Sequence, residues 1–244
     1  MCIRDRPYRD TERCGHVIRF NYIADIYGLE NVDGKLVRCR NFPVGGIYLD
    51  NMTSNCVVYG NIIARVGMIG ILMHNGKNNL IENNVIVDSP VGIKFQDVIV
   101  SLRAFTRYAG FMTGNVLHRN IYSRTRPGSI PIAFEVERGE DRVVAFCDEN
   151  LYHGVAGSAC RVRQRNWRDA GKNRDYTGEE WQRLGFDEGS LVGDPLFVDP
   201  SKDDYRLQPD SPALKLGFIP IPAEKIGIRA AVSGNPGSPA GTSQ

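Results

Sequence analysis

The chain has 244 residues, of which 42% are hydrophobic and 24% charged, a composition typical of a globular protein with a substantial core. Thirty basic and 28 acidic residues leave a net charge of +2, so we expect no strong field for nucleic acid or an anionic membrane. The longest apolar or glycine run, residues 66–73, is far shorter than the roughly 20 residues that a membrane-spanning helix needs. We therefore expect neither nucleic acid nor a membrane span.

The first six residues, Met1-Cys-Ile-Arg-Asp-Arg6, contain no apolar stretch and no small-residue cleavage site, so they form neither a signal peptide nor a tag. They resemble the translation of a transposon adapter used in DNA library preparation; a natural polar N-terminus is the alternative. If residues 1–6 are such an artefact, the natural chain begins upstream of Pro7 and its signal region is missing. The cysteines after Arg6 have no C-x-x-C spacing and histidines are few, so we predict no metal site and assign no disulfide.

Three short segments repeat at a nearly constant interval. They are Gly46-Ile-Tyr-Leu-Asp-Asn51, Gly70-Ile-Leu-Met-His-Asn75 and Gly92-Ile-Lys-Phe-Gln-Asp97, and their glycines lie 24 and 22 residues apart. Apolar residues alternate within each segment, which is the periodicity of a β-strand. A repeat of this length, built only from short strands and turns, predicts an all-β parallel β-helix.

A second series places asparagine before two apolar or aromatic residues. Its members are Asn21, Asn61, Asn84, Asn115 and Asn150. Asparagine suits the inward corner of a coil because it tolerates the left-handed αL conformation and because its amide can bond the asparagine above and below. An ordinary β-sandwich is the alternative fold, and it predicts no column of matching residues.

The chain after residue 160 differs from the repeats. Residues 161–187 are polar and irregular, and Thr177-Gly-Glu-Glu180 has the pattern of a capping box. Trp181 and Leu184 would form the buried face of a short helix that ends at Gly185.

The predicted organisation is a single domain. Residues 194–200 predict a short strand between two Asp-Pro turns. We expect β-helix coils over residues 7–160 and an irregular C-terminal cap over residues 161–228, which covers the unpaired edge of the last coil. Residues 229–244 are rich in glycine, serine, proline and alanine, and predict a disordered tail.

Several of these stretches resemble right-handed parallel β-helix proteins of the pectin-lyase type. They are Gly46-Ile-Tyr-Leu-Asp-Asn51, Tyr59-Gly-Asn-Ile62 and Glu82-Asn-Asn-Val85. Three C-terminal motifs closely resemble the closing segment of bacterial carbohydrate-active β-helix proteins, of which glycoside hydrolase family 141 is the nearest characterised group. These motifs are Glu180-Trp-Gln-Arg-Leu-Gly-Phe-Asp187, Gly193-Asp-Pro-Leu-Phe-Val-Asp-Pro200 and Asp210-Ser-Pro-Ala-Leu-Lys-Leu-Gly-Phe218.

The resemblance covers residues 17–228 and implies a secreted or periplasmic glycoside hydrolase that acts on a complex polysaccharide or oligosaccharide, as a monomer when full length and without a cofactor. Because β-helices also carry lyases, epimerases and non-enzymatic binders, the fold alone does not fix the reaction. Two alternatives therefore stay open: a polysaccharide lyase and a non-catalytic glycan-binding β-helix.

If the repeats stack as aligned, outward-facing residues form columns in which neighbours lie ~4.8 Å apart. One column would contain Tyr48, Leu72 and Lys94, and the next Asp50, His74 and Gln96. The segment Ile132-Ala-Phe-Glu-Val136 has the same alternation and would add Ala133 and Glu135 to these columns. We expect a polysaccharide to bind along this exposed face.

Asp50 is the leading catalytic candidate, because a solvent-facing carboxylate on an otherwise apolar strand can act as acid, base or nucleophile. The alternative is that Asp50-Asn51 only starts a turn. The proteins that the chain resembles often read Asp-Asp at this place, so Asn51 keeps a hydrogen-bonding role at most. His74 would lie within hydrogen-bond reach of Asp50 and could serve as an acid or a sugar contact, or be an ordinary turn histidine.

A glycosidase usually needs two carboxyls, ~5–5.5 Å apart for retention and ~6.5–9.5 Å apart for inversion. By strand spacing Asp97 would lie on the order of 10 Å from Asp50, and Glu135 roughly 14 Å away. Neither separation fits either mechanism well, so the second catalytic carboxyl could be Asp97 or could lie in the missing N-terminal part. We place Tyr48, Asn51, Lys94, Gln96 and Glu135 among the sugar contacts.

The lyase alternative rests on basic residues. β-Elimination from a uronic acid needs a cation that neutralises the carboxylate and a base that takes the C5 proton, and Lys94, Arg103 and Arg107 could supply them, with Ca²⁺ as a possible metal. Tyr108 and Trp167 could stack on sugar rings. Solvated loop charges are the alternative explanation of the two arginines.

Overall fold

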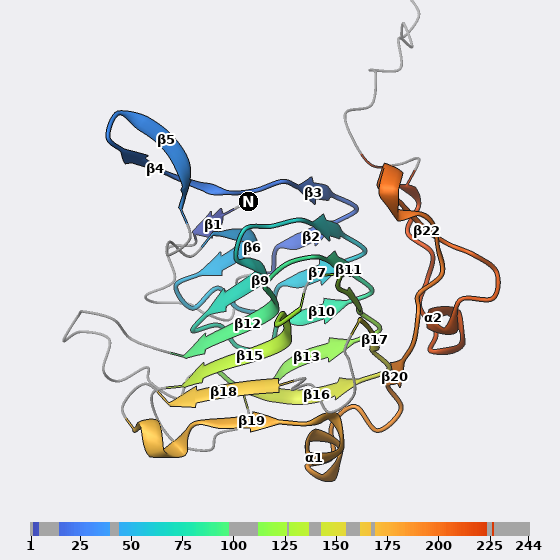
Figure 1. The fold of residues 1–244 in the computed structure, drawn as a ribbon. Helices are drawn as coiled ribbons and strands as arrows, with labels where there is room; N and C mark the ends of the chain where they lie inside the picture. The colour runs from blue at the N-terminus through green and yellow to red at the C-terminus, as the bar shows by residue number, and fades with distance from the viewer. Residues whose placement is uncertain are drawn as a thin grey trace, which may run out of the picture.

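The computed structural model describes residues 2–4, 15–39, 44–97, 112–125, 127–136, 143–154, 162–166, 169–223 and 226. This part of the chain is mostly β, and its long sheets consist almost entirely of parallel strands (Figure 1). No helix within these ranges is long and apolar enough to cross a membrane. The predicted disordered tail, residues 229–244, lies outside the described residues.

Three sheets contain most of the strands. Sheet A consists of β1 (Cys2–Arg4), β6 (Gly45–Asp50), β9 (Ile69–His74), β12 (Val91–Asp97), β15 (Ile130–Val136), β18 (Val162–Asn166) and the antiparallel β19 (Arg174–Tyr176). Sheet B consists of β2 (Val17–Arg19), β7 (Val57–Tyr59), β10 (Leu80–Glu82), β13 (Asn115–His118) and β16 (Val144–Asp148). Sheet C consists of β3 (Tyr22–Ala24), β8 (Ile62–Ala64), β11 (Val85–Val87), β14 (Ile121–Ser123), β17 (Leu151–His153) and β20 (Leu191–Val192).

Consecutive strands enter sheets A, B and C in turn, and the fourth strand returns to sheet A beside the first. Thus β6, β7 and β8 form one three-strand repeat, and β9 pairs in parallel with β6. β1 lies beside β6 with Arg4 in register with Asp50. The proposed origin of residues 1–6 stays a prediction.

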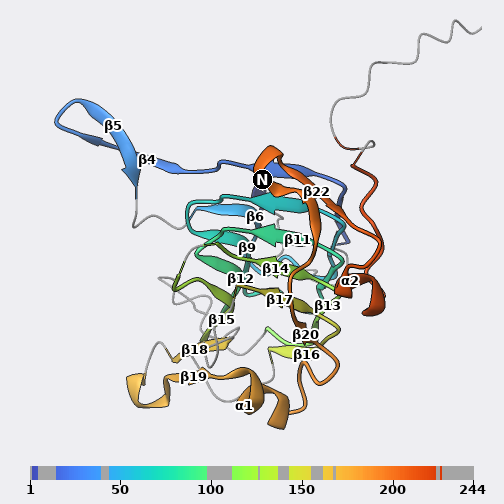
Figure 2. The same ribbon diagram turned by 45° about the vertical axis from the view of Figure 1, so that its right-hand side comes forward.

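The other elements lie outside these sheets. They are the hairpin β4 (Gly28–Val32) and β5 (Lys35–Cys39), a 3₁₀ turn (Ala170–Lys172), α1 (Gly178–Arg183), the antiparallel pair β21 (Phe197–Asp199) and β22 (Asp204–Leu207) with a 3₁₀ turn (Pro200–Lys202) between them, and α2 (Pro212–Lys215). The hairpin extends away from the sheets (Figures 1 and 2).

Apolar side chains from successive repeats stack in the interior. One fully buried column in sheet A contains Ile47, Ile71, Ile93, Ile132 and Val162, which are paired in register. The stacked aromatic pairs Phe95–Phe134 and Tyr122–Tyr152 each have ring centroids 5.1 Å apart. Strand alternation therefore produces the core that the sequence pattern predicts.

The glycine near the start of three successive sheet A strands, β6, β9 and β12, is required by the close approach of neighbouring strands. A Cβ on Gly46 would lie 2.8 Å from the carbonyl oxygen of Gly70, and one on Gly70 would lie 2.6 Å from that of Gly92. A Cβ on Gly92 would meet the carbonyl oxygen of Pro131 at 2.5 Å. Any larger residue would force these strands apart, which explains the glycine that recurs in the sequence.

A ladder of side-chain amides runs along the corner between sheets B and C. Its members are Asn21, Asn61, Asn84, Asn120 and Asn150, and each Nδ2 group donates to the next Oδ1 at 2.9–3.3 Å. The predicted amide ladder is confirmed, but Asn115 was wrongly included. Asn115 belongs to a second ladder, in which its Oδ1 accepts from the backbone N–H of Asn79 at 3.0 Å.

The left-handed backbone conformation lies one residue earlier than predicted. Positive φ angles occur at the residue before each ladder asparagine, namely Phe20, Gly60, Asn83, Arg119 and Glu149. The corner is therefore turned by the preceding residue, and the buried asparagine bonds its neighbours and nearby backbone carbonyls.

Residues 169–193, which we call the end cover, lie over the end of the stack. β19 pairs with β18 and β20 pairs with β17, while β18 and β17 are the last parallel strands before this segment. α1 begins with the predicted capping box, in which the Thr177 hydroxyl accepts from the N–H of Glu180 at 3.2 Å. Trp181 enters the interior cluster and stacks on Phe186. Leu184 is exposed, because α1 ends at Arg183; its prediction as a buried residue was wrong.

Residues 194–223, which we call the strap, do not cap the end of the stack. The strap runs back along the outer face of sheet C (Figure 2). Its buried residues Phe197, Tyr205, Ala213 and Phe218 pack on the outward-facing apolar residues of sheet C, namely Ile62, Ala64, Val85, Val87, Ile121 and Leu151. The predicted C-terminal cap is therefore an end cover followed by a strap.

Candidate functional site

The outer face of sheet A carries the columns of side chains that the alignment of the chain's own repeated segments predicts. Strand register pairs Tyr48, Leu72, Lys94, Ala133 and Arg163 in one column. The next column pairs His74, Gln96, Glu135 and Arg165. Asp50 extends this column onto β6: Leu49 pairs with Met73, so the next residue, Asp50, lies opposite His74. Most of the predicted site residues are thereby brought onto one face of four neighbouring strands.

Asp50 is the centre of a compact polar group at the β6 end of this face. His74 Nδ1 lies 3.1 Å from Asp50 Oδ1. The Tyr48 hydroxyl lies 3.5 Å from the same His74 nitrogen, and Asn51 Nδ2 donates to Asp50 Oδ2 at 3.2 Å. The side chains of Asp50 and His74 are only 8% and 18% exposed, so their interaction is poorly screened by solvent.

Lys94, Gln96 and Glu135 form the second polar group, two strands further along. Lys94 Nζ lies 2.9 Å from Glu135 Oε1, and Gln96 Nε2 donates to Glu135 Oε2 at 3.0 Å. The Lys94 and Glu135 side chains are 13% and 24% exposed. Both carboxylate oxygens of Glu135 are thus held by neighbours.

Arg163 and Arg165 extend the face onto β18, a strand that the sequence analysis did not predict. Both contact Asp175 of β19, at 3.3 Å from Arg163 Nε and 2.6 Å from Arg165 NH1. The hydrogen bonds from Arg165 and then Arg163 lower the pKa of Asp175. The signal was available: Val162-Arg-Gln-Arg-Asn166 alternates in the way a strand does, but it was interpreted as part of an irregular loop.

Asp97 does not join Asp50. It lies at the end of β12 in register with Val136, and strand alternation places it on the same side as Ile93 and Phe95. Asp97 is buried, whereas the open column carries Gln96. The structure therefore does not bring together the two carboxylates that were named for hydrolysis.

Four other candidates lie outside the described residues. They are Arg103, Arg107, Tyr108 and Trp167.

The face is more enclosed than predicted. Leu72 and Ala133 lie in the outward columns and are nevertheless buried, and the charged groups beside them are mostly covered. Charged side chains are seldom so little exposed unless they are paired or form a functional site. Here they are paired across strands, and together they form a half-buried polar surface suited to a polar ligand.

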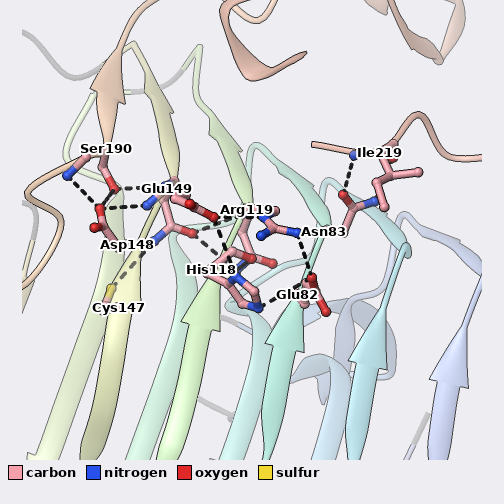
Figure 3. A network of polar contacts seen from close by, with 12 residues as sticks. Glu82, Asn83, His118, Arg119, Cys147, Asp148, Glu149, Ser190 and Ile219 are labelled. Atoms are coloured by element: carbon pink, nitrogen blue, oxygen red, sulfur yellow. Dashed lines mark hydrogen bonds and ion pairs between the residues drawn. The ribbon is translucent and has the colours of Figure 1, made fainter. Parts of the chain in front are cut away.

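A second polar network lies on the outer face of sheet B (Figure 3). Glu82 and Glu149 both contact His118 and Arg119, the shortest contact being 2.8 Å between Arg119 Nε and Glu149 Oε2. The hydrogen bond from Glu149 raises the pKa of Arg119.

Residues beside this network hold the C-terminal segments in place. Asp148 Oδ1 accepts from the N–H of Gly189 at 2.7 Å, and Asn83 exchanges two hydrogen bonds of 2.7 Å with the backbone of Ile219 (Figure 3). These contacts attach the end cover and the strap to the repeats. We therefore interpret the sheet B network as structural.

Neither region has the ligands of a metal centre. Among the residues that the structure describes, no group of three or more His, Cys, Asp or Glu side chains could hold a metal ion. The possible Ca²⁺ of the lyase alternative stays a prediction.

Comparison of the chain with protein-family models, with curated proteins and with solved structures found no match. The assignment of function therefore depends on the geometry of the sheet A face.

Proposed function

We propose that the three sheets are the faces of a right-handed parallel β-helix of carbohydrate-active type. The strand order supports this, because each repeat contributes one strand to every sheet and, apart from the β18–β19 pair, the neighbouring strands of these sheets are parallel. The amide ladder and the glycine column are spaced by the same repeat. The right hand is expected because crossover connections between parallel strands are almost always right-handed.

We further propose that the outer face of sheet A binds a polysaccharide strand. The supporting observation is the half-buried row of Asp50, His74, Lys94 and Glu135, which spans β6 to β15. Three strand spacings make this row roughly 14 Å long, enough for several polar contacts along an extended chain. Hydroxyl groups of a sugar can both donate and accept, so they match a surface of mixed carboxylate, amide, ammonium and imidazole groups. A polysaccharide ligand fits a secreted or periplasmic location.

Hydrolysis at Asp50 is the second candidate function, and the Asp50–His74 contact favours it. A carboxylate beside an imidazole at 3.1 Å forms a pair that can hold and transfer a proton. Glu135 lies three strands away, roughly 14 Å by strand spacing, which is too far for either two-carboxylate mechanism. Cleavage would therefore use Asp50 together with His74 rather than Asp50 and Glu135.

Elimination is the less favoured reaction. A lyase needs a cation available to the uronate carboxylate, and Lys94 already contacts Glu135 at 2.9 Å. Arg163 and Arg165 are likewise held by Asp175. A uronate would have to displace one of these carboxylates.

The test is a polysaccharide panel with three readouts: retention in affinity electrophoresis, release of reducing ends, and near-ultraviolet absorbance of unsaturated products. Wild type is compared with Asp50→Asn and Lys94→Met, and Lys202→Met is the matched control, because Lys202 is an exposed lysine of the strap. We expect retention on at least one glycan, lost in Lys94→Met and kept in the control.

The readouts separate the candidates. Reducing ends that are lost in Asp50→Asn, without absorbance, support hydrolysis. Retention without turnover in wild type supports binding alone, and absorbance supports elimination. Retention that is identical in all four proteins would contradict the sheet A face as the binding site.

A further inference from the structure

The half-buried row on sheet A, made of Asp50, His74, Lys94 and Glu135, contains two carboxylates and one ammonium. Lys94 is the group of this row that would bind an anionic ligand, but its Nζ lies 2.9 Å from Glu135 Oε1. The side chains of Lys94 and Glu135 are 13% and 24% exposed, so solvent screens their contact only weakly. The position that a uronate carboxylate would take on Lys94 is therefore filled by a carboxylate of the chain itself.

Glu135 is held in this position from two sides. Its Oε1 contacts Lys94, and its Oε2 accepts from Gln96 Nε2 at 3.0 Å. Lys94 and Gln96 lie two residues apart on β12, in register with Ala133 and Glu135 of β15. A ligand that displaced Glu135 would break both contacts and leave a half-buried carboxylate without its cation, which is costly.

The bonding capacity that remains in the row favours hydroxyl groups. A carboxylate has roughly four lone-pair sites, and the contacts with Lys94 and Gln96 use only part of this capacity in Glu135. A sugar hydroxyl can donate to Glu135 and accept from Lys94. A uronate carboxylate can only accept and would meet Glu135 and Asp50, whereas an ammonium can only donate and would meet Lys94. Either charged group would therefore face one of its own sign.

We propose that the sheet A face selects an uncharged polysaccharide and that Glu135 is the specificity-determining residue, which excludes uronates by occupying Lys94. This inference rests on the polysaccharide binding proposed above and names the class of the ligand. Asp50 adds to the exclusion, because it places a second carboxylate in the same row. Removal of the Glu135 carboxylate should make Lys94 available to an anionic sugar.

The test is affinity electrophoresis in three pairs of soluble polysaccharides that share a backbone and differ in charge. They are hydroxyethyl and carboxymethyl cellulose, xylan and carboxymethyl xylan, and methyl-esterified and de-esterified homogalacturonan. We expect wild type to bind the uncharged member of at least one pair about tenfold more tightly than the charged member. A fourth pair, glycol chitin and glycol chitosan, adds an ammonium in place of a carboxylate, and we expect the same preference there.

The decisive variant is Glu135→Gln, which should bind the carboxylated member of a pair at least as tightly as the uncharged member. Glu179→Gln is the matched control, because it removes the same charge from a side chain of α1 that is 84% exposed, and it should keep the wild-type preference. Thermal melts verify that each variant is folded. Gln96→Leu is the second variant: it removes one of the two contacts that hold Glu135 and should reduce the preference by a smaller factor.

The dependence on salt gives an independent readout. Binding that Glu135→Gln gains toward a carboxylated glycan depends on an ion pair with Lys94, so it should weaken as sodium chloride is raised. Binding of the uncharged glycan by wild type should change little.

The outcomes separate this inference from the function on which it rests. Tighter binding of a charged member by wild type, or an unchanged preference in Glu135→Gln, would overturn the selection and leave the sheet A face as a glycan site. The absence of binding to every polysaccharide, in wild type and in all variants, would overturn the polysaccharide function together with this inference.

Discussion

The outer faces of sheets C and A differ in what surrounds their outward-facing side chains. On sheet C the outward residues are apolar, and the strap buries them in a cluster separate from the interior. On sheet A the corresponding positions carry carboxylate, imidazole, amide and ammonium groups that contact one another across strands. One face is completed by the chain itself, and the other presents polar groups in a half-buried setting.

We link the apolar face of sheet C to the stability of the fold and the polar face of sheet A to the proposed binding. Burial of apolar area by the strap stabilises the fold, since each large side chain contributes ~1.5–3 kcal/mol. Paired charges in a half-buried setting contribute little net stability, because desolvation offsets their attraction. We therefore expect substitutions on sheet C to act mainly on unfolding, and substitutions on sheet A mainly on binding.

The largest effect is expected under the strap. Phe218→Ala removes a buried ring that packs against the sheet C cluster, and the resulting cavity should lower the free energy of unfolding by ~3–5 kcal/mol. Chemical denaturation monitored by circular dichroism measures it. The neighbouring Ile219→Ala is the control, because its side chain is exposed and its backbone bonds to Asn83 are unaffected. Equal effects of the two substitutions would show that the strap packs only loosely.

An intermediate effect is expected where the strap is held by charge. Arg65 donates to Asp25 of the first repeat and to Asp203 of the strap, so Arg65→Met disconnects both. The aspartates are partly exposed, and we expect a loss of only ~1 kcal/mol after solvent screening. Thermal melts measure it, with Arg206→Met as a control at an exposed strap arginine. A larger loss than in Phe218→Ala would reverse the proposed order of apolar and ionic contributions.

The same contact predicts an acid-sensitive strap. The hydrogen bonds from Arg65 hold the pKa of Asp203 at about 2, below its usual value of 3.8. A lowered folded-state pKa stabilises the protein above pH ~4, and this contribution is lost as the pH falls from ~4 toward 2. Melts across this range should show a smaller acid loss in Asp203→Asn than in wild type. Parallel curves for the two proteins would assign the acid sensitivity to other groups.

The sequence predicted the interior better than the surface. Glycine at a fixed interval and strict alternation follow from strand stacking, so the columns of sheet A could be aligned from the residues alone. The sequence analysis named Asn115 and omitted Asn120, although Asn115-Val-Leu117 and Asn120-Ile-Tyr122 both fit the pattern of asparagine before two apolar or aromatic residues. The structure distinguishes them: Asn120 accepts from Asn84 and continues the ladder, whereas Asn115 accepts from the backbone of Asn79.

The candidate site was less predictable than the interior, because the local sequence pattern does not fix every position in three dimensions. Alternation placed Asp50, His74 and Glu135 on one face, but the last position of a strand is ambiguous, and Asp97 fell on the inner side. The strap was missed because nothing in residues 194–223 indicates that they lie beside Ile62 and Val85, more than 100 residues earlier in the chain. Contacts between such distant segments have no local signal.

The smallest effect on stability is expected on sheet A, and it tests the comparison most directly. Lys94→Met/Glu135→Gln removes both charges of a half-buried pair while it keeps the side-chain volume and the Gln96 neighbour. Because neither charge is left alone, we expect the Tm to change by less than ~2 °C. The single variant Glu135→Gln leaves Lys94 without its carboxylate and should cost more than the double variant. If the double variant were destabilised as strongly as Phe218→Ala, the sheet A pairs would be structural, and the contrast between a face built for stability and a face built for binding would fail.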